Sequence, residues 1–202
     1  MKIVLYGRPF NRTDRVQWLF EELKLEYEYR VLDVFELEHR SSEIGRKYPL
    51  ARLPFVEINS DVMFESGAIM LYFAETFREK ADLFPRADEK VYREVLQWLF
   101  FAISTLEISD ESLGSGADPG PSAPLADTLQ FVDKVLESKK YIAGNSFSVA
   151  DIALSNGFKW FDRRLLNKHR NIVAYCSDHM KRPSYQKILS QAEYPDRAKN
   201  LF

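Results

Sequence analysis

Glu65-Ser66-Gly67 combines residue types that could hold a small zwitterion. This segment follows an apolar run and begins a stretch with helical spacing. The first turn of a helix has free N–H groups, which together with the Ser66 hydroxyl can bind a carboxylate. The neighbouring Glu65 can bind an ammonium group, so the pair would suit the head group of an α-amino acid. The same residues are also consistent with a plain helix N-cap, which by itself is at least as common.

A second polar segment, Asn11-Arg12-Thr13-Asp14-Arg15, follows the first apolar run of the chain. It falls in a connection from a predicted strand to a predicted helix, where α/β sheets bind ligands. Asn11, Thr13 and the Tyr6 hydroxyl are hydrogen-bond donors that could face an anion or a thiolate. An equally supported alternative is that Thr13 is the helix N-cap and that the two arginines are solvated or paired.

Leu53-Pro54 precedes a short apolar run that reads as a strand. A proline that opens a strand lacks the N–H that a central ladder needs. A cis bond before Pro54 would turn the backbone outward, so that Leu53 could pair with an extended peptide ligand. Because cis X–Pro bonds are rare, the tetrapeptide Arg52-Leu53-Pro54-Phe55 alone favours an ordinary trans bond.

Two further features indicate structural roles. Ser148-Val149-Ala150-Asp151 has the spacing of a helix capping box, and we expect it to stabilise a helix start. Cys176 lies in a segment with helical spacing, where a lone cysteine is usually a small buried apolar residue. No Ser/His/Asp arrangement is visible in the sequence.

The first 80 residues alternate between strand and helix patterns. Ile3–Tyr6 predicts a buried strand, and the apolar spacing from Thr13 onward predicts a helix. The alternation at Tyr27–Val31 predicts a second strand, which a βαβ connection makes parallel to the first. After a polar stretch with room for a short helix, the remaining predicted elements are a hairpin of Phe55–Ile58 and Val62–Phe64, and a helix from Glu65.

The second half of the sequence has no strand pattern. We expect a linker at 78–87 between an α/β domain at 1–77 and an all-helical domain at 88–202. Ser112–Pro124 is rich in glycine and proline and predicts a loop or lid. The predicted helices run from Val91 to about Glu107, and over Leu125–Leu136, Val149–Leu166 and Asn171–Met180.

Composition excludes several classes of protein. The chain has 202 residues, 46% of them hydrophobic, and its 28 basic and 30 acidic residues give a net charge of −2. This balance does not favour binding to nucleic acid or to a membrane surface. One cysteine and three histidines make a disulfide framework impossible and a zinc cluster unexpected. With neither a signal-peptide pattern nor a long apolar run, we expect a cytoplasmic protein.

The ordered set of motifs resembles the cytosolic glutathione S-transferase superfamily, over essentially the whole chain. Tyr48–Pro54 looks like the family's Asn-Pro-x-Gly-x-Val-Pro, and Phe64–Ile69 looks like its Glu-Ser-x-Ala-Ile. Phe147–Asp151 looks like its buried capping box. The resemblance implies an α/β plus all-α fold, with a thioredoxin-like βαβ-ββα domain before the helical domain.

The same resemblance implies a binding site for glutathione as co-substrate, with no metal. The residue before a cis proline would pair with the cysteinyl part of the peptide. The Glu-Ser pair would hold its γ-glutamyl end, and nearby cations would face its glycine carboxylate. The residues implied are Leu53, Pro54, Glu65, Ser66, His39, Arg40 and Arg52.

The catalytic position departs from the most common pattern of the family. Lowering a thiol pKa by about two units needs roughly 2.7 kcal/mol of selective thiolate stabilisation. Members use Ser, Tyr or Cys after the first strand, whereas this segment resembles a bacterial and fungal version with Asn11 at the serine position. We therefore rank Asn11 first as the thiol-contacting donor, Thr13 second and Tyr6 third. Cys176 lies in the predicted helical domain and not near Tyr6–Arg15, which disfavours the cysteine-based branch of the family.

The resemblance predicts a homodimeric enzyme that attaches glutathione to an apolar electrophile. Phe10, Trp98 and Phe101, with the Ser112–Pro124 loop, are the candidates for the electrophile pocket. One alternative is a glutathione-dependent disulfide reductase of the same fold. Another is a binding or regulatory protein without catalysis, which the unusual residue at position 11 favours and the retained glutathione motifs oppose.

Overall fold

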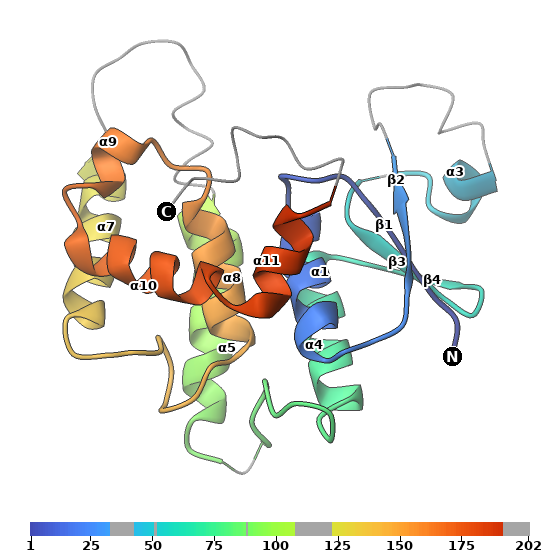
Figure 1. The fold of residues 1–202 in the computed structure, drawn as a ribbon, viewed down its shortest axis with the longest axis horizontal. Coiled ribbons are helices and arrows are strands. Elements are labelled where there is room, and N and C mark those ends of the chain that lie inside the picture. The colour runs from blue at the N-terminus through green and yellow to red at the C-terminus, as the bar shows by residue number, and fades with distance from the viewer. Residues whose placement is uncertain (33–42, 51, 88, 108–122, 192–202) are drawn as a thin grey trace. The chain divides into compact units, whose positions relative to one another are not determined.

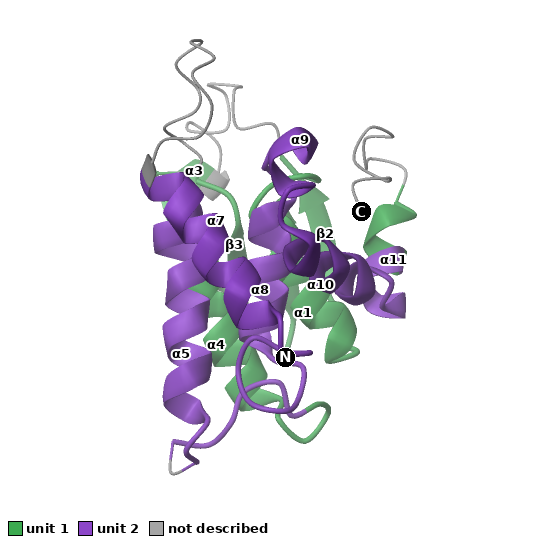
Figure 2. Ribbon diagram, turned by 90° about the vertical axis from the view of Figure 1, so that its left-hand side faces the viewer, with its two compact units in different colours: residues 1–81, 187–199 green, residues 82–186, 200–202 purple. Residues whose placement is uncertain are grey.

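The chain forms two compact units. One consists of Met1–Ala81 with Lys187–Lys199, and the other of Asp82–Gln186 with Asn200–Phe202 (Figure 2). A computed structural model describes residues 1–32, 43–50, 52–87, 89–107 and 123–191. Within these residues, no helix has both the length and the apolar composition to cross a membrane.

The first unit is built on a mixed four-stranded sheet with strand order β2-β1-β3-β4. β1 pairs with β2 in parallel, whereas β3 is antiparallel to both β1 and β4. Both the parallel βαβ pair and the hairpin are therefore confirmed. The strands are β1 (Ile3–Gly7), β2 (Glu28–Val31), β3 (Phe55–Ile58) and β4 (Asp61–Phe64).

Helices cover the sheet on both sides (Figure 1). α1 (Thr13–Glu22) and α4 (Ser66–Thr76) pack against each other on one side, and the short α3 (Glu43–Lys47) lies on the other. The apolar stripe of α1 explains this packing, because its side chains are fully buried and Phe20 lies 4.6 Å from Phe73 of α4, centroid to centroid.

The sheet face away from α1 and α4 carries its own aromatic cluster. Val4, Tyr6, Tyr48 and Phe55 are all buried there. The β1–β3 register places Tyr6 opposite Phe55, and their rings stack at 4.6 Å. This register fixes the position of the Tyr6 ring beside the end of the sheet.

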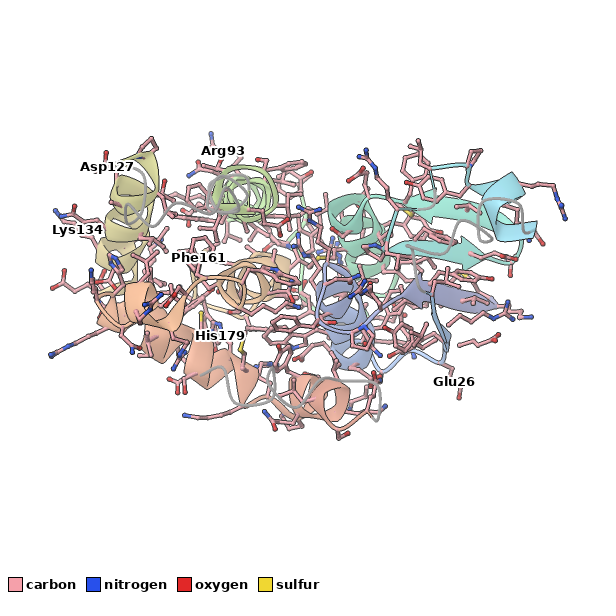
Figure 3. All side chains as sticks on the ribbon, turned by 90° about the horizontal axis from the view of Figure 1, so that it is seen from above. Glu26, Arg93, Asp127, Lys134, Phe161 and His179 are labelled. Atoms are coloured by element: carbon pink, nitrogen blue, oxygen red, sulfur yellow. The ribbon has the colours of Figure 1, made fainter. Side chains whose placement is uncertain are left out.

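The second unit is helical in its described part. α8 is its centre, because every residue of this helix is buried and it packs against α5, η1 and α10. Figure 3 shows Phe161 and His179 among the packed side chains of this unit, and Asp127 and Lys134 on its outer helix. The elements are α5 (Tyr92–Phe100), the π-helix η1 (Phe101–Leu106), α7 (Ala123–Leu136), α8 (Val149–Phe158), α9 (Arg163–Leu166) and α10 (Arg170–Met180). α11 (Pro183–Leu189) begins in this unit, and its residues from Lys187 onward belong to the first unit.

Two predicted helices differ from the structure in detail, and one helix was not predicted. The single helix expected over Val149–Leu166 is wrong, since Asp162 accepts the Arg164 N–H at 2.7 Å and starts a separate helix. The helix after Val91 is confirmed, but its second half is a π-helix. α11 was not predicted, although a proline at the first helical position is a recognised start signal.

The predicted loop at Ser112–Pro124 lies mostly outside the described residues. Only its last two residues are described, and they belong to α7. Cys176 is fully buried, as expected, and burial raises the pKa of its thiol.

Candidate functional site

The topology of the sheet brings three connections to one end. Tyr6 of β1 lies opposite Phe55, and Phe55 lies opposite Phe64 of β4. The chain therefore leaves β1, enters β3 and leaves β4 at the same end of the sheet. We call Asn11, Leu53, Glu65 and Ser66, which lie in these connections, the sheet-end cluster.

Leu53 and Pro54 are joined by a cis peptide bond. The expectation from the family resemblance is confirmed, and the preference for trans drawn from the tetrapeptide alone is wrong. Pro54 is buried, and the half-buried Leu53 packs against the aromatic cluster of the sheet.

Glu65 and Ser66 form the junction between β4 and α4. Glu65 has φ 69°, in the left-handed region, and its side chain is exposed. Its carbonyl accepts the Ile69 N–H at 2.9 Å. Ser66 is the first residue of α4 and is 7% exposed. The arrangement leaves a carboxylate in solvent beside the start of a helix, as binding of an amino-acid head group requires.

Tyr48 is a neighbour of this junction that the sequence reading did not single out as a site residue. Its ring stacks on Phe64 at 4.9 Å. Burial raises the pKa of Tyr48, the charge of Glu65 raises it further and that of Arg52 lowers it, so both charges act on this hydroxyl. Arg52 itself is exposed. In the sequence, the aromatic residues within Tyr48–Phe64 are the signal that could have indicated that Tyr48 lies near this junction.

Asn11 lies in the connection between β1 and α1. Its Oδ1 accepts the Thr13 N–H at 2.6 Å, which satisfies one free donor of the helix start. The preceding Phe10 has φ 59°, and its N–H donates to Asp14 Oδ1 at 3.2 Å. Asn11 is half-buried, so part of this residue is exposed.

Thr13, unlike Asn11, lies within α1. It is the first residue of α1 rather than its N-cap, which is Arg12, so the N-cap alternative for Thr13 is wrong. Thr13 is fully buried, and its hydroxyl accepts the Arg8 N–H at 3.3 Å. A Cβ at Gly7 would clash with Thr13 Cγ2, so the Thr13 side chain packs directly against the backbone at Gly7.

The Tyr6 hydroxyl interacts with two charged side chains. It accepts from Arg30 Nη1 at 3.1 Å and donates to Glu57 Oε2 at 3.4 Å. Burial raises the pKa of Tyr6, with Arg30 opposing the change and Glu57 adding to it. Tyr6 is only 2% exposed. Of the three predicted thiol-contacting groups, Asn11 is therefore the most accessible.

The remaining predicted site residues are scattered. His39 and Arg40 lie outside the described residues. Phe10 is a half-buried residue of the first unit. In the second unit, Trp98 is 5% exposed and meets the ring of Phe101 edge to face at 5.1 Å. Across the described residues, no three His, Cys, Asp or Glu side chains gather as metal ligands.

Comparison with known proteins defines the class of the two units. The family model described as "Glutathione S-transferase, N-terminal domain" matches residues 1–75, and that described as "Glutathione S-transferase, C-terminal domain" matches residues 123–183. Both matches fall on the units just described and together span two thirds of the chain.

Relatives and solved structures agree with this class. Glutathione S-transferase D7 of Anopheles gambiae is 27% identical, over 93% of this chain and 92% of its own. A glutathione transferase structure from Methylococcus capsulatus is 24% identical, with TM-score 0.81 over 95% of this chain and 98% of that one. The structure of URE2P8 from Phanerochaete chrysosporium, with oxidized glutathione, is 19% identical, with TM-score 0.76 over 93% of each chain.

The chain belongs to the glutathione S-transferase family, and its enzyme class is that of the glutathione transferases. Its fold is the one predicted, a mixed α/β unit followed by a helical unit. The bacterial-type subclass stays a prediction.

Proposed function

We propose that the protein binds glutathione at the sheet-end cluster and activates its thiol for attack on an apolar electrophile. The observation that carries this proposal is the convergence of the connections holding Asn11, Leu53 and Glu65-Ser66 at one end of the sheet. Glutathione is a peptide with an amino-acid head group, a thiol and a terminal carboxylate, and this end of the sheet offers a group for each of the first two.

Each contact has a chemical reason. The exposed Glu65 carboxylate would pair with the γ-glutamyl ammonium, while the Ser66 hydroxyl and the N–H groups of α4 would hold its carboxylate. The backbone of Leu53 would pair with the cysteinyl residue. Roles for Arg52, His39 and Arg40 at the glycine carboxylate remain part of the proposal.

Asn11 is the proposed donor to the thiolate. Its Oδ1 accepts from the Thr13 N–H, which holds the side chain in one orientation at the helix start. A preoriented amide donor can stabilise a developing anion without reorganisation. The side chains of Thr13 and Tyr6 are almost fully buried, which supports ranking them lower.

Binding can be tested by calorimetry with glutathione. Glu65→Gln should weaken glutathione binding about tenfold, because the ammonium loses its charged partner. Glu75→Gln, on the exposed face of α4, is the matched control and should bind like the wild type. Failure of the wild-type protein to bind millimolar glutathione would overturn the proposal.

Catalysis can be tested by Asn11→Asp, which keeps an acceptor for the Thr13 N–H and replaces the donor with an anion. We expect kcat with an aryl halide to fall roughly ten- to hundredfold, with little change in stability. Asn145→Ala, an exposed position in the second unit, is the control. An Asn11→Asp enzyme with unchanged kcat would exclude Asn11 as the thiol-contacting group.

Two alternative functions use the same binding site. Glutathione-dependent disulfide reduction would show as activity on a disulfide substrate that exceeds activity on the aryl halide. A binding or regulatory protein would bind glutathione and show neither activity. Both alternatives are supported by the same feature, which is that the neutral amide of Asn11 stands in place of Ser, Tyr or Cys. Homodimer formation and cytoplasmic location are likewise proposals, testable by light scattering and cell fractionation.

A further inference from the structure

The connection between β1 and α1 contains a residue in an unfavourable backbone conformation. Phe10, which directly precedes Asn11, has φ 59°, in the left-handed region. A bulky residue is uncommon in this region and stays there only where neighbouring groups hold it. Because Phe10 is joined to Asn11 by a rigid peptide unit, this conformation sets the direction in which the chain enters Asn11.

Asp14 supplies two hydrogen bonds that hold this conformation. Its Oδ1 accepts the Phe10 N–H at 3.2 Å. Its own N–H donates to the Asn11 carbonyl at 3.2 Å. The Phe10 N–H and the Asn11 carbonyl are the two ends of the Phe10-Asn11 dipeptide, so Asp14 holds the backbone of this dipeptide at both ends.

The Asn11 side chain is held by a different residue. Its Oδ1 accepts the Thr13 N–H at 2.6 Å. Thr13 is in turn fixed against the end of β1, because its hydroxyl accepts the Arg8 N–H and its side chain packs against the backbone at Gly7. Thr13 therefore fixes the side chain of Asn11, whereas Asp14 fixes its backbone.

The Asp14 side chain acts from inside the protein. Asp14 is 0% exposed, as is its neighbour Arg15. Burial, followed by the charge of Arg12, lowers the pKa of Arg15 to about 9, whereas the charge of Asp14 raises it. A buried carboxylate is tolerated when hydrogen bonds and an opposite charge compensate for its lost hydration. Since it is fully buried, Asp14 can affect a bound ligand only through the residues that it holds.

We propose that Asp14 is a positioning residue, whose carboxylate holds the backbone of Phe10 and Asn11 so that Asn11 contacts the thiol of glutathione. This inference rests on the proposed function, because it takes Asn11 as the thiol-contacting donor. The charge of Asp14 does not supply the effect, since a carboxylate near a thiolate raises the thiol pKa. The acceptor oxygen supplies it, by fixing the donor before the thiolate forms.

Two substitutions of Asp14 separate the acceptor oxygen from the charge. Asp14→Ala removes both, and the pKa of the bound glutathione thiol should rise by about one pH unit, followed by the ultraviolet absorbance of the thiolate. Asp14→Asn removes the charge and keeps an acceptor oxygen, so the thiol pKa should stay within about 0.3 of the wild-type value or fall. If Asp14→Ala does not fold, Asp14→Ser replaces it, because its hydroxyl lies one bond nearer the backbone than Oδ1.

Binding and turnover should respond differently to Asp14→Ala. We expect kcat/KM with an aryl halide to fall about tenfold, because less of the bound thiol is ionised. Glutathione affinity should stay within about threefold of the wild type by calorimetry, because the proposed contacts of Leu53, Glu65 and Ser66 are retained.

Glu21→Gln is the matched control on the same helix. Glu21 accepts from the Tyr27 hydroxyl at 2.8 Å and from Lys187 at 2.6 Å, near the end of α1 away from Asn11. Its substitution should lower stability and leave the thiol pKa within about 0.3 of the wild-type value. A general loss of stability in α1 is thereby distinguished from a loss of positioning.

Amide hydrogen exchange in the ligand-free protein tests the geometry without glutathione. The Phe10 N–H should exchange at least about tenfold faster in Asp14→Ala, because it loses its acceptor. In Asp14→Asn and Glu21→Gln its rate should stay within about threefold of the wild type. Unchanged exchange in Asp14→Ala would overturn the proposal.

The thiol pKa gives three further contrary results: no rise in Asp14→Ala, an equal rise in Asp14→Asn, or an equal rise in Glu21→Gln. If Asn11→Asp lowers kcat and Asp14→Ala leaves the thiol pKa unchanged, the positioning role alone is wrong. If the wild-type protein does not bind glutathione, or Asn11→Asp leaves kcat unchanged, the proposed function or its donor is wrong and the positioning role with it.

Discussion

Two groups of polar residues, both located where a helix begins, differ in what their side chains contact. In the second unit, Ser148 precedes α8, and its N–H and hydroxyl donate to Asp151 at 2.8 and 3.0 Å. The Ile142 N–H and the Tyr175 hydroxyl complete four bonds to that buried carboxylate. We call Ser148, Asp151, Ser155, Tyr175 and His179 the buried polar cluster. In the sheet-end cluster, by contrast, the Glu65 carboxylate is exposed.

The order of serine and acid explains this difference. In Ser148-x-x-Asp151 the acid comes three residues after the serine, so its carboxylate can turn back to the N-cap N–H. In Glu65-Ser66 the acid comes first, and its side chain stays in solvent. Polar residues at a helix start thus stabilise the fold when they hydrogen-bond to one another. They are available to a ligand when they stay exposed to solvent.

The largest expected effect is on stability, from Asp151→Asn. The amide NH₂ of the new side chain would face hydrogen-bond donors that now face a carboxylate oxygen. Those buried donors would lose their acceptor. We expect the free energy of unfolding to fall by about 3 kcal/mol, measured by urea denaturation.

Asp127→Asn is the matched control, since Asp127 is exposed on α7 (Figure 3). It should leave the free energy of unfolding within about 0.5 kcal/mol of the wild type. Equal stabilities of the Asp151→Asn and Asp127→Asn proteins would contradict the structural role of the buried polar cluster.

The second effect is a pH dependence of stability that comes from His179. Burial and the neighbouring cations lower its pKa to about 4, so the unfolded chain takes up a proton at a higher pH than the folded one. Stability is therefore present above pH 6.5 and is lost as the pH falls towards 4. Between pH 7 and pH 5 the loss should be about 2 kcal/mol.

The contribution of His179 can be isolated by comparing unfolding at both pH values in His179→Gln and His169→Gln. Only the first substitution should reduce the difference between the two pH values. An unchanged difference in His179→Gln would show that another group carries the pH dependence.

The smallest effect, and the most direct test of the comparison, comes from the two serines. Ser148→Ala should lower the free energy of unfolding by about 1 kcal/mol and leave glutathione binding unchanged. Ser66→Ala should weaken glutathione binding by about fivefold, close to 1 kcal/mol, with a smaller effect on unfolding. Urea denaturation and calorimetry on both variants measure the two effects. If Ser66→Ala affects stability alone, the sheet-end serine is a helix cap and nothing more.

The sequence predicted most elements because their signals are local. Short apolar runs predicted β1, β3 and β4, and alternation predicted β2. Apolar spacing predicted α1 and α5, and Ser148-x-x-Asp151 predicted the start of α8. The break after Phe158 was missed, because the apolar residues on both sides continue one helical pattern. The tetrapeptide around Pro54 likewise did not predict the cis bond, which followed from the family resemblance instead.

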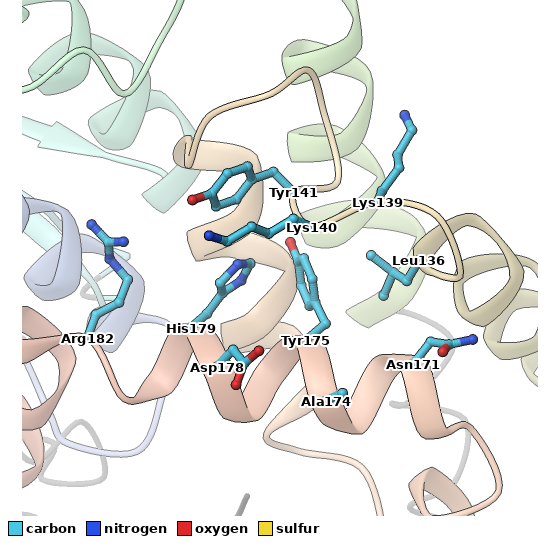
Figure 4. A pocket seen from close by; sticks show the side chains of 10 residues that line it. All are labelled: Leu136, Lys139, Lys140, Tyr141, Asn171, Ala174, Tyr175, Asp178, His179 and Arg182. Carbon is cyan, nitrogen blue, oxygen red and sulfur yellow. The ribbon is translucent and has the colours of Figure 1, made fainter.

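The sequence by itself determined the order of the strands and of most helices, the family and the motifs at the sheet end. Only the tertiary structure decided which donors are accessible. Tyr6, Thr13 and Asn11 are similar candidates in sequence, yet the Tyr6 hydroxyl contacts Arg30 and Glu57, which lie 24 and 51 residues away. Partners so distant in sequence meet only when strands pair. The same reason applies to a pocket of the second unit, whose wall joins the end of α7 to α10 (Figure 4).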